Sequence, residues 1–170
     1  MMSNQSLNKT TINTRRAMRA DIFRRLGGIN THQPRFTALL QTDGSFQHHT
    51  KRSRVAMMLT TETHRYTLSH MTKIPDAQDS TETEWASIHH GLLFALENNE
   101  RNIHIENDNM SVIRGLMLSD SILKNEYAKY NRYMIMNTVA KTYWTAIRWI
   151  PRELNASDKL FGNKKRRQLR

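Results

Sequence analysis

The chain has 170 residues, of which 38% are hydrophobic, and this is enough for one core of ordinary domain size. No apolar stretch of about 18 residues suggests a membrane span, and the absence of cysteine excludes disulfides, thiolate metal sites and cysteine nucleophiles. We therefore expect one soluble, intracellular domain, cytoplasmic by default, with a monomer as its simplest oligomeric state.

The net charge of +11 is concentrated at the two ends of the chain. Residues 1–35 hold seven basic residues and one acid, residues 164–170 hold five basic residues, and the stretch between holds 14 of each sign. Basic arms on a neutral body indicate a polyanion such as nucleic acid as partner, with no sign of a membrane partner. A mitochondrial transit peptide is the alternative for the Arg-, Ser- and Thr-rich N-terminus.

This charge distribution divides the chain into three parts. Residues 1–34 form a basic N-terminal arm or a targeting segment, in which residues 17–26 are expected to form a helix that ends at Gly27 and Gly28. The other two parts are one compact domain at residues 35–163 and a basic tail at residues 164–170.

The domain is predicted to begin with an antiparallel meander of three strands. Residues 35–42 are apolar and β-prone, and residues 54–60 and 65–71 alternate between apolar and polar. An apolar stripe at spacings of three and four then predicts a helix at residues 81–98. The elements predicted after it are a strand at 102–107, helices at 109–118 and 124–144, a strand at 146–150 and a helix from about 155. The order βββαβααβα is that of a mixed α/β domain.

Four acidic residues occupy comparable places in these elements. Asp43 and Asp108 are expected at strand ends, and Glu84 and Asp158 in first helical turns. Each has an ordinary explanation as a turn or helix-capping residue. Strand ends and first helical turns can also converge on one rim of a sheet, where crowded carboxylates repel one another unless a cation lies among them. The set therefore predicts a Mg²⁺ or Mn²⁺ site suited to phosphodiester chemistry.

Four motifs around these acids resemble the ribonuclease H family, over most of residues 36–163. They are TDGSF at 42–46, TETEWASIHHGLLFAL at 81–96, IENDNMSVIRGL at 105–116 and WIPRELNASDKLFGN at 149–163. The resemblance implies a ribonuclease H-like fold, in which a five-stranded mixed sheet is flanked by helices.

By the same resemblance, the four acids are the catalytic and metal-binding residues of an endonuclease. Asp43 would bridge two Mg²⁺ ions, for which Mn²⁺ could substitute, with Asp158 completing one site and Glu84 and Asp108 the other. Water would then hydrolyse the RNA strand of an RNA–DNA hybrid and leave a 3′-hydroxyl and a 5′-phosphate. The nucleic-acid contacts that the resemblance implies are Gly44, Ser45, Thr83, Asn109, Arg152 and Asn155.

The chain departs from the family pattern at three places. Typical members carry a histidine in the loop before the last acid, whereas here no histidine follows His104 and the loop reads PRELN. Arg52, Ser53 and Arg54 stand where glycines are common, and Met110 stands where a hydrogen-bonding side chain is frequent. Two alternatives therefore stay open: a DNA nuclease or resolvase of the same fold, and a catalytically weak nucleic-acid-binding module in a nucleoprotein assembly.

Overall fold

The computed structural model describes residues 37–61, 67–117 and 123–162. The predicted arm at residues 1–34, with its helix at 17–26, and the predicted tail at residues 164–170 lie outside these ranges, so the division into three parts stays a prediction. Within the described ranges, no helix combines the length and the apolar character needed to cross a membrane.

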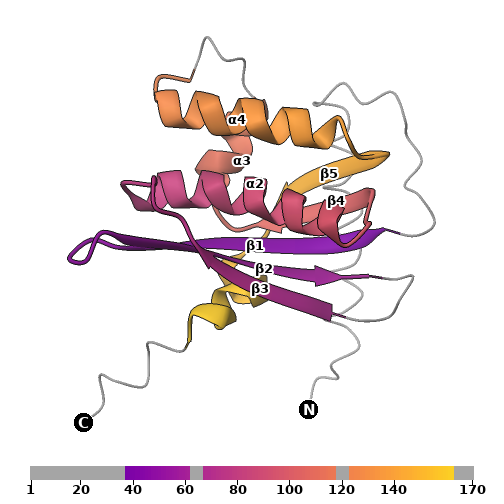
Figure 1. Ribbon diagram of the computed structural model, residues 1–170, viewed down its shortest axis with the longest axis horizontal. Helices are drawn as coiled ribbons and strands as arrows, with labels where there is room; N and C mark the ends of the chain where they lie inside the picture. The colour runs from indigo at the N-terminus through magenta and orange to yellow at the C-terminus, as the bar shows by residue number, and fades with distance from the viewer. Residues whose placement is uncertain (1–36, 62–66, 118–122, 163–170) are drawn as a thin grey trace, which may run out of the picture.

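Five strands form one mixed sheet in the order β3-β2-β1-β4-β5 (Figure 1). The strands β1, β2 and β3 pair antiparallel, whereas β4 pairs parallel with both β1 and β5. Their bounds are β1 Ala38–Gln47, β2 Arg52–Thr60, β3 Thr67–Lys73, β4 Asn102–Asn107 and β5 Trp144–Trp149. The predicted meander and the predicted mixed five-stranded sheet are confirmed.

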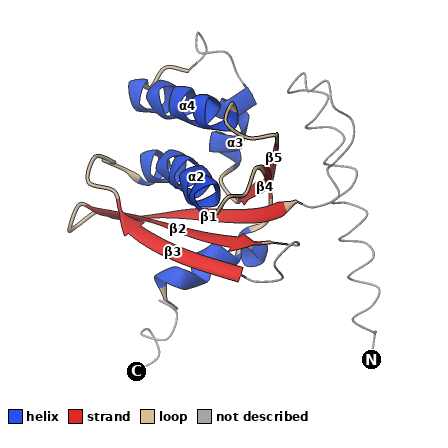
Figure 2. Ribbon diagram, turned by 45° about the vertical axis from the view of Figure 1, so that its right-hand side comes forward, coloured by secondary structure: helices blue, strands red, loops and turns tan. Residues whose placement is uncertain are grey.

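The helices lie in layers on the two faces of the sheet. Figures 1 and 2 show α2 directly on one face, α4 beyond α2 on the same side, and the 3-10 helix η2 on the opposite face. The bounds are α2 Ser80–Glu97, α3 Met110–Met117, α4 Glu126–Val139, η1 Arg152–Leu154 and η2 Ala156–Phe161.

The core lies between α2 and the sheet. The α2 residues Ile88 and Leu92 are fully buried against apolar strand residues such as Leu40, Met57 and Ile105. Because side chains alternate along a strand, the neighbours of these residues point to the other face, which carries η2. Apolar packing therefore occupies the α2 face of the strands, and the η2 face is left for residues outside this core.

Two of the predicted acid positions are wrong in detail. Asp43 lies in the middle of β1 rather than at its end, because β2 pairs with β1 as far as Gln47. Glu84 is the fifth residue of α2, beyond the first turn. The capping role proposed for it belongs to Glu82, whose backbone N–H donates to the N-cap Asp79 and whose carboxylate accepts from Gln78 N.

Two element boundaries near the C-terminus also differ from the prediction. Asp158 lies in η2, whose bonds span three residues, as from Gly162 N to Lys159 O, so no α-helix begins at Asn155. The helix predicted at 124–144 ends at Val139, and Trp144 is instead the first residue of β5. Both errors arise where a short polar segment follows a regular element.

Candidate metal centre

Three acids from three elements meet at one point. Asp43 comes from β1, Glu84 from α2 and Asp108 from the residue after β4, and one oxygen of each lies within 4.8 Å of the others. Parallel pairing explains part of this, since Asp43 and Asp108 each lie two residues beyond the pair Gln41–Glu106. Oxygens on opposite sides of a Mg²⁺ ion are about 4.2 Å apart, so this spacing suits such an ion.

Gly44 lets α2 approach β1 closely enough to bring Glu84 to Asp43. A Cβ at Gly44 would lie 2.8 Å from Glu84 N and 2.9 Å from Thr83 O, where only backbone could give way. The backbone of Gly44 also forms a hydrogen bond with the Glu84 carboxylate. The Asp-Gly pair that suggested a turn is therefore a close contact between a strand and a helix.

Replacing Gly44 with Ala is expected to push α2 away and lower the free energy of unfolding by about 1–3 kcal/mol. Gly91→Ala is the matched control, because its Cβ would meet the Thr42 side chain at 2.5 Å rather than backbone. Urea unfolding and Mn²⁺ binding should be measured for both. Gly44→Ala should weaken Mn²⁺ binding more than Gly91→Ala at a similar loss of stability, and equal effects on Mn²⁺ would contradict the special role of Gly44.

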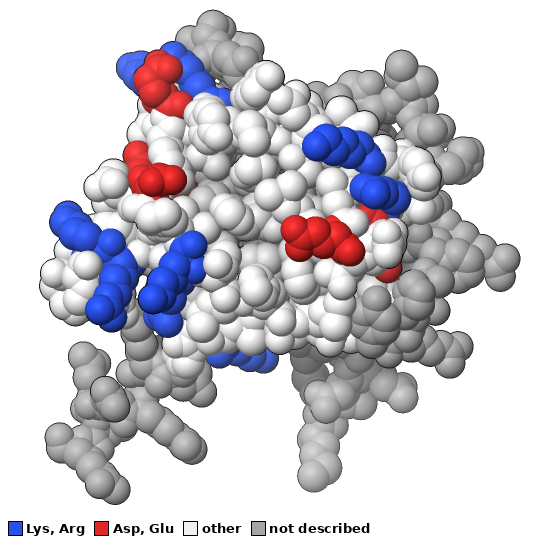
Figure 3. Space-filling model, viewed as in Figure 1, with Lys and Arg blue, Asp and Glu red and all other residues white. Residues whose placement is uncertain are grey.

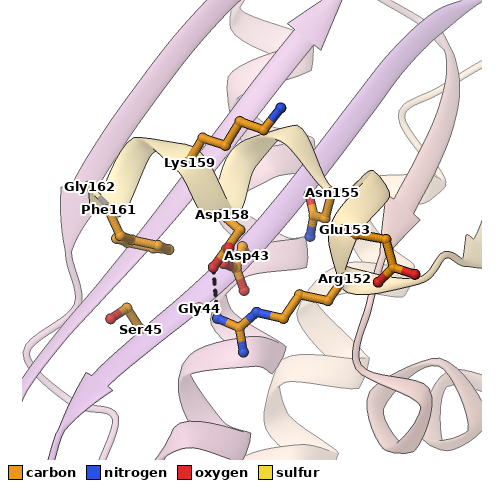
Figure 4. Close-up of a pocket in the computed structure, with 10 residues that line it drawn as sticks. All are labelled: Asp43, Gly44, Ser45, Arg152, Glu153, Asn155, Asp158, Lys159, Phe161 and Gly162. Atoms are coloured by element: carbon orange, nitrogen blue, oxygen red, sulfur yellow. Dashed lines mark hydrogen bonds and ion pairs between the residues drawn. The ribbon is translucent and has the colours of Figure 1, made fainter. Parts of the chain in front are cut away.

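Asp158 joins the three acids through Asp43. Its carboxylate accepts a hydrogen bond from the protonated Asp43 side chain, and Arg152 donates to its Oδ1 at 2.7 Å. Figure 4 shows Asp43 and Asp158 together at the floor of a cleft, with Arg152 extending toward them from η1. The cleft has a volume of about 660 Å³. Asp43 therefore contacts Asp158 as well as the pair formed by Glu84 and Asp108.

The site holds more negative charge than its surroundings favour. Asp43 is 2% exposed, and its Oδ2 has no hydrogen-bond partner within the described residues. Burial and then the charges of Glu84 and Asp108 raise the pKa of Asp43 to about 9, and burial and then Asp108 raise the pKa of Glu84 to about 7. A divalent cation would remove this penalty, so the donor set fits one.

Asp158 has the opposite electrostatic character. Its partial burial acts to raise its pKa, but the hydrogen bond from Arg152, the hydrogen bond with Asp43 and the charge of Arg152 together outweigh burial and hold the pKa below its ordinary value. The exposed Arg152 side chain is therefore a counter-charge for the fourth acid in the absence of a cation. The Asp158 end of the cluster therefore has a permanent positive charge beside it, on Arg152, whereas the Glu84–Asp108 end has no such partner among the described residues.

Two buried asparagine side chains hold the acids in place. Asn107 Nδ2 lies 3.1 Å from Thr42 O and 3.3 Å from Glu84 Oε2, and Asn155 Nδ2 donates to Thr42 O at 2.9 Å and to Asp108 Oδ1 at 3.1 Å. Both amides thus meet at the residue before Asp43. The sequence did not single out Asn107, because nothing in its local pattern separates it from other strand-end asparagines.

The predicted nucleic-acid contacts fall into two groups. Ser45 and Arg152 line the cleft, as Gly44 does. Thr83 and Asn155 are 0% and 2% exposed, and their side chains bond within the protein, Thr83 to Asp79 O at 2.7 Å. Both side chains help to position the site, Asn155 also lines the cleft, and their contact with nucleic acid stays a prediction.

Asn109, the remaining predicted contact, is half-buried at the start of α3. Its Oδ1 accepts hydrogen bonds from Ser111 N at 3.0 Å and Val112 N at 3.2 Å, so it caps the helix. The capping role considered for Asp108 therefore belongs to Asn109. This leaves the Asp108 carboxylate to the cluster.

Known proteins share this fold and this sequence pattern. A family model described as Reverse transcriptase-like matches residues 41–161, a span that contains all four acids. No curated protein matches the sequence.

Solved structures of RNase H domains have the same fold. The N-terminal RNase H domain of Rv2228c from Mycobacterium tuberculosis has a TM-score of 0.64 at 16% identity and covers 74% of this chain and 90% of its own. RNase H1 from Halobacterium salinarum NRC-1 has a TM-score of 0.60 at 16% identity, with 72% and 89% covered. LC11-RNase H1 in complex with an RNA/DNA hybrid has a TM-score of 0.60 at 17% identity, with 72% and 92% covered. The chain therefore belongs to the Reverse transcriptase-like family, whose ribonuclease H fold its motifs predicted.

Proposed function

We propose that this protein is a divalent-metal-dependent endonuclease that hydrolyses the RNA strand of RNA–DNA hybrids. The observation that carries the proposal is the meeting of Asp43, Glu84 and Asp108 within 4.8 Å in a buried setting, with Asp43 Oδ2 lacking a described partner. Crowding carboxylates in this way lowers the stability of the fold when no cation is bound. The cluster therefore suits chemistry in which a cation offsets the negative charge.

Each acid has a place in this proposal. Asp43, at the centre, would contact both of two cations, with Asp158 completing one position and Glu84 and Asp108 the other. Bound Mg²⁺ would supply the charge stabilisation that phosphodiester hydrolysis requires. Asn107 and Asn155 would keep the carboxylates aimed inward throughout the reaction. Arg152, which stands in the loop that lacks a histidine, would offer a positive charge to a phosphate entering the cleft.

The hybrid is the favoured substrate for two reasons. LC11-RNase H1, which shares the fold, was solved with an RNA/DNA hybrid bound. In this chain Ser45 and the backbone of Gly44 line the cleft beside Asp43, where they could meet a 2′-hydroxyl, the group that distinguishes RNA from DNA.

Matched RNA–DNA, RNA–RNA and DNA–DNA duplexes of one sequence, each with Mg²⁺, test the substrate. We expect cleavage of the RNA strand in the hybrid alone, with 5′-phosphate ends and no cleavage when EDTA replaces Mg²⁺. Cleavage of the DNA duplex would instead favour a DNA nuclease of the same fold. Binding without cleavage of any duplex would leave only a nucleic-acid-binding module.

A further inference from the structure

A second pocket is lined by four basic side chains. Lys51, Arg52 and Arg54 come from the β1–β2 hairpin and β2, and Lys73 from the end of β3. The pocket has a volume of about 380 Å³, and its remaining lining residues, Gln47, Ser53, Ile74 and Pro75, carry no charge. We refer to it as the basic pocket.

The basic pocket lies on the same face of the sheet as Asp43. Residues directly opposite one another in an antiparallel pair share a face, and the strand pairing sets Ser45 against Arg54, and Arg54 against Lys73. Ser45 and Asp43 share a face because they are two residues apart on β1. The Arg54 guanidinium lies 5.5 Å from the centre of the Phe161 ring, which lines the carboxylate cleft. Arg54 therefore connects the two pockets.

The arrangement of charges in the basic pocket is unfavourable for the isolated protein. Arg54 and Lys73 are directly opposed like charges on neighbouring strands, which destabilises a sheet. None of the four cations forms an ion pair with a carboxylate of residues 37–61, 67–117 or 123–162. Figure 3 shows basic side chains gathered at its lower left, toward the hairpin end of the sheet. A polyanion would relieve this repulsion.

The backbone around the basic pocket is held in place by the sheet. Ile74 N donates to Ser53 O at 3.0 Å, and the buried Ser53 hydroxyl donates to Ile74 O, so the end of β3 is tied to β2. Gln47, which lines the basic pocket, is four residue steps after Asp43 on β1, and at about 3.3 Å per step this is about 13 Å. This corresponds to the axial rise of about four base pairs.

We propose that the basic pocket binds backbone phosphates of the same duplex whose scissile phosphate lies at the carboxylate cluster, about four base pairs away. The proposal rests on the proposed function only in requiring that a duplex occupies the cleft. The pocket contacts no base, so its contribution is independent of sequence. It explains why cations stand at Arg52 and Arg54, where the family commonly has glycine.

The double variant Arg52→Gln/Lys73→Gln tests this proposal. It leaves Arg54 on Phe161 and so spares the carboxylate cleft. The matched control is Arg101→Gln/Lys141→Gln. It removes the same charge just before β4 and β5 begin, at the end of these strands that is far from Asp108. Binding to a fluorescently labelled RNA–DNA hybrid should be measured by anisotropy at several salt concentrations, in an Asp43→Asn background that prevents cleavage. Cleavage by each variant with Asp43 intact is measured in parallel.

We expect the double variant to bind about 10-fold more weakly at 0.1 M salt, and the slope of log K against log salt to fall by about 2. Its stability should not decrease, since repulsion is removed. If the slope of log K against log salt is unchanged in the double variant, or changes equally in the control, phosphate binding by the basic pocket is overturned, even if the wild type cleaves the hybrid. If the protein with Asp43 intact cleaves no duplex but the double variant loses binding, the basic pocket is supported and the proposed activity is overturned. Failure of the Asp43→Asn protein to bind any duplex would overturn both.

Discussion

Replacing Asp43 with Asn is expected to lower hybrid cleavage by about 10³-fold or more, which corresponds to about 4 kcal/mol of lost transition-state stabilisation. Among the described acids, Asp43 is the one that contacts both Asp158 and the Glu84–Asp108 pair, so its loss would affect every cation position of the proposed mechanism. Asp79→Asn is the matched control, because it makes the same chemical change at an N-cap, where Asn serves as well as Asp. Cleavage should be compared at saturating Mg²⁺, and near-normal activity of Asp43→Asn would contradict the assigned role.

The same substitution is expected to stabilise the protein in the absence of metal. The raised pKa of about 9 means that folded Asp43 keeps a proton that the unfolded chain loses near pH 4. The free energy of unfolding of the wild type therefore falls as the pH rises from about 4 to about 9. Asn imitates the protonated acid, so Asp43→Asn should be more stable by on the order of 2 kcal/mol at pH 7.5 and less dependent on pH. A less stable variant would show that the carboxylate cluster is not strained.

The largest loss of stability is expected from Glu106→Ala. Glu106 and Arg148 are 1% and 2% exposed and form an ion pair between β4 and β5, so removing one partner leaves a buried charge. Such a change typically costs about 3–5 kcal/mol. Gln41 connects the ion pair to the site, because its Nε2 donates to Glu106 Oε2 at 2.8 Å and to Leu154 O at 3.0 Å. Glu106→Ala should therefore also loosen the segment that carries Asp158.

Glu126→Ala is the control for this change, since Glu126 pairs with Lys129 at 2.6 Å but its side chain is 84% exposed. An exposed pair contributes about 0.2–1 kcal/mol, so this variant should unfold at nearly the wild-type urea concentration. The double variant Glu106→Ala/Arg148→Met, in which no charge is left unpaired, should recover part of the lost stability. Equal urea midpoints for Glu106→Ala and Glu126→Ala would contradict the importance of the buried pair.

The identity of the acids could be predicted from the sequence better than their local surroundings. TDGSF and the helix motif around Glu84 pointed to acids that the structure brings together, but the local signals for a turn at Asp43 and a cap at Glu84 were misleading. Strand β1 continues through Asp43 because nine residues of β2 pair with it, and this pairing is a tertiary effect. The D-x-x-E spacing of Asp79 and Glu82 was the true capping signal, and it was visible in the sequence.

The supporting network could not be predicted, because its members are distant in sequence. Glu106 and Arg148 are 42 residues apart and become neighbours only through the parallel pairing of β4 and β5. A charged residue in a short strand ordinarily indicates a solvent-facing position, whereas here both side chains are buried and form an ion pair with each other. The bonds from the Asn155 amide to Thr42 O and Asp108 were likewise not visible in the sequence, since they join residues far apart in the chain.

The most direct test of the metal centre is Mn²⁺ binding to the metal-free protein, followed by electron paramagnetic resonance with Mg²⁺ as competitor. The four carboxylates predict that wild-type protein binds Mn²⁺, that Mg²⁺ displaces it, and that Asp43→Asn binds at least about 10-fold more weakly while Asp79→Asn binds normally. Equal Mn²⁺ binding by wild type and Asp43→Asn, or no binding by the wild type, would contradict a metal centre at these acids.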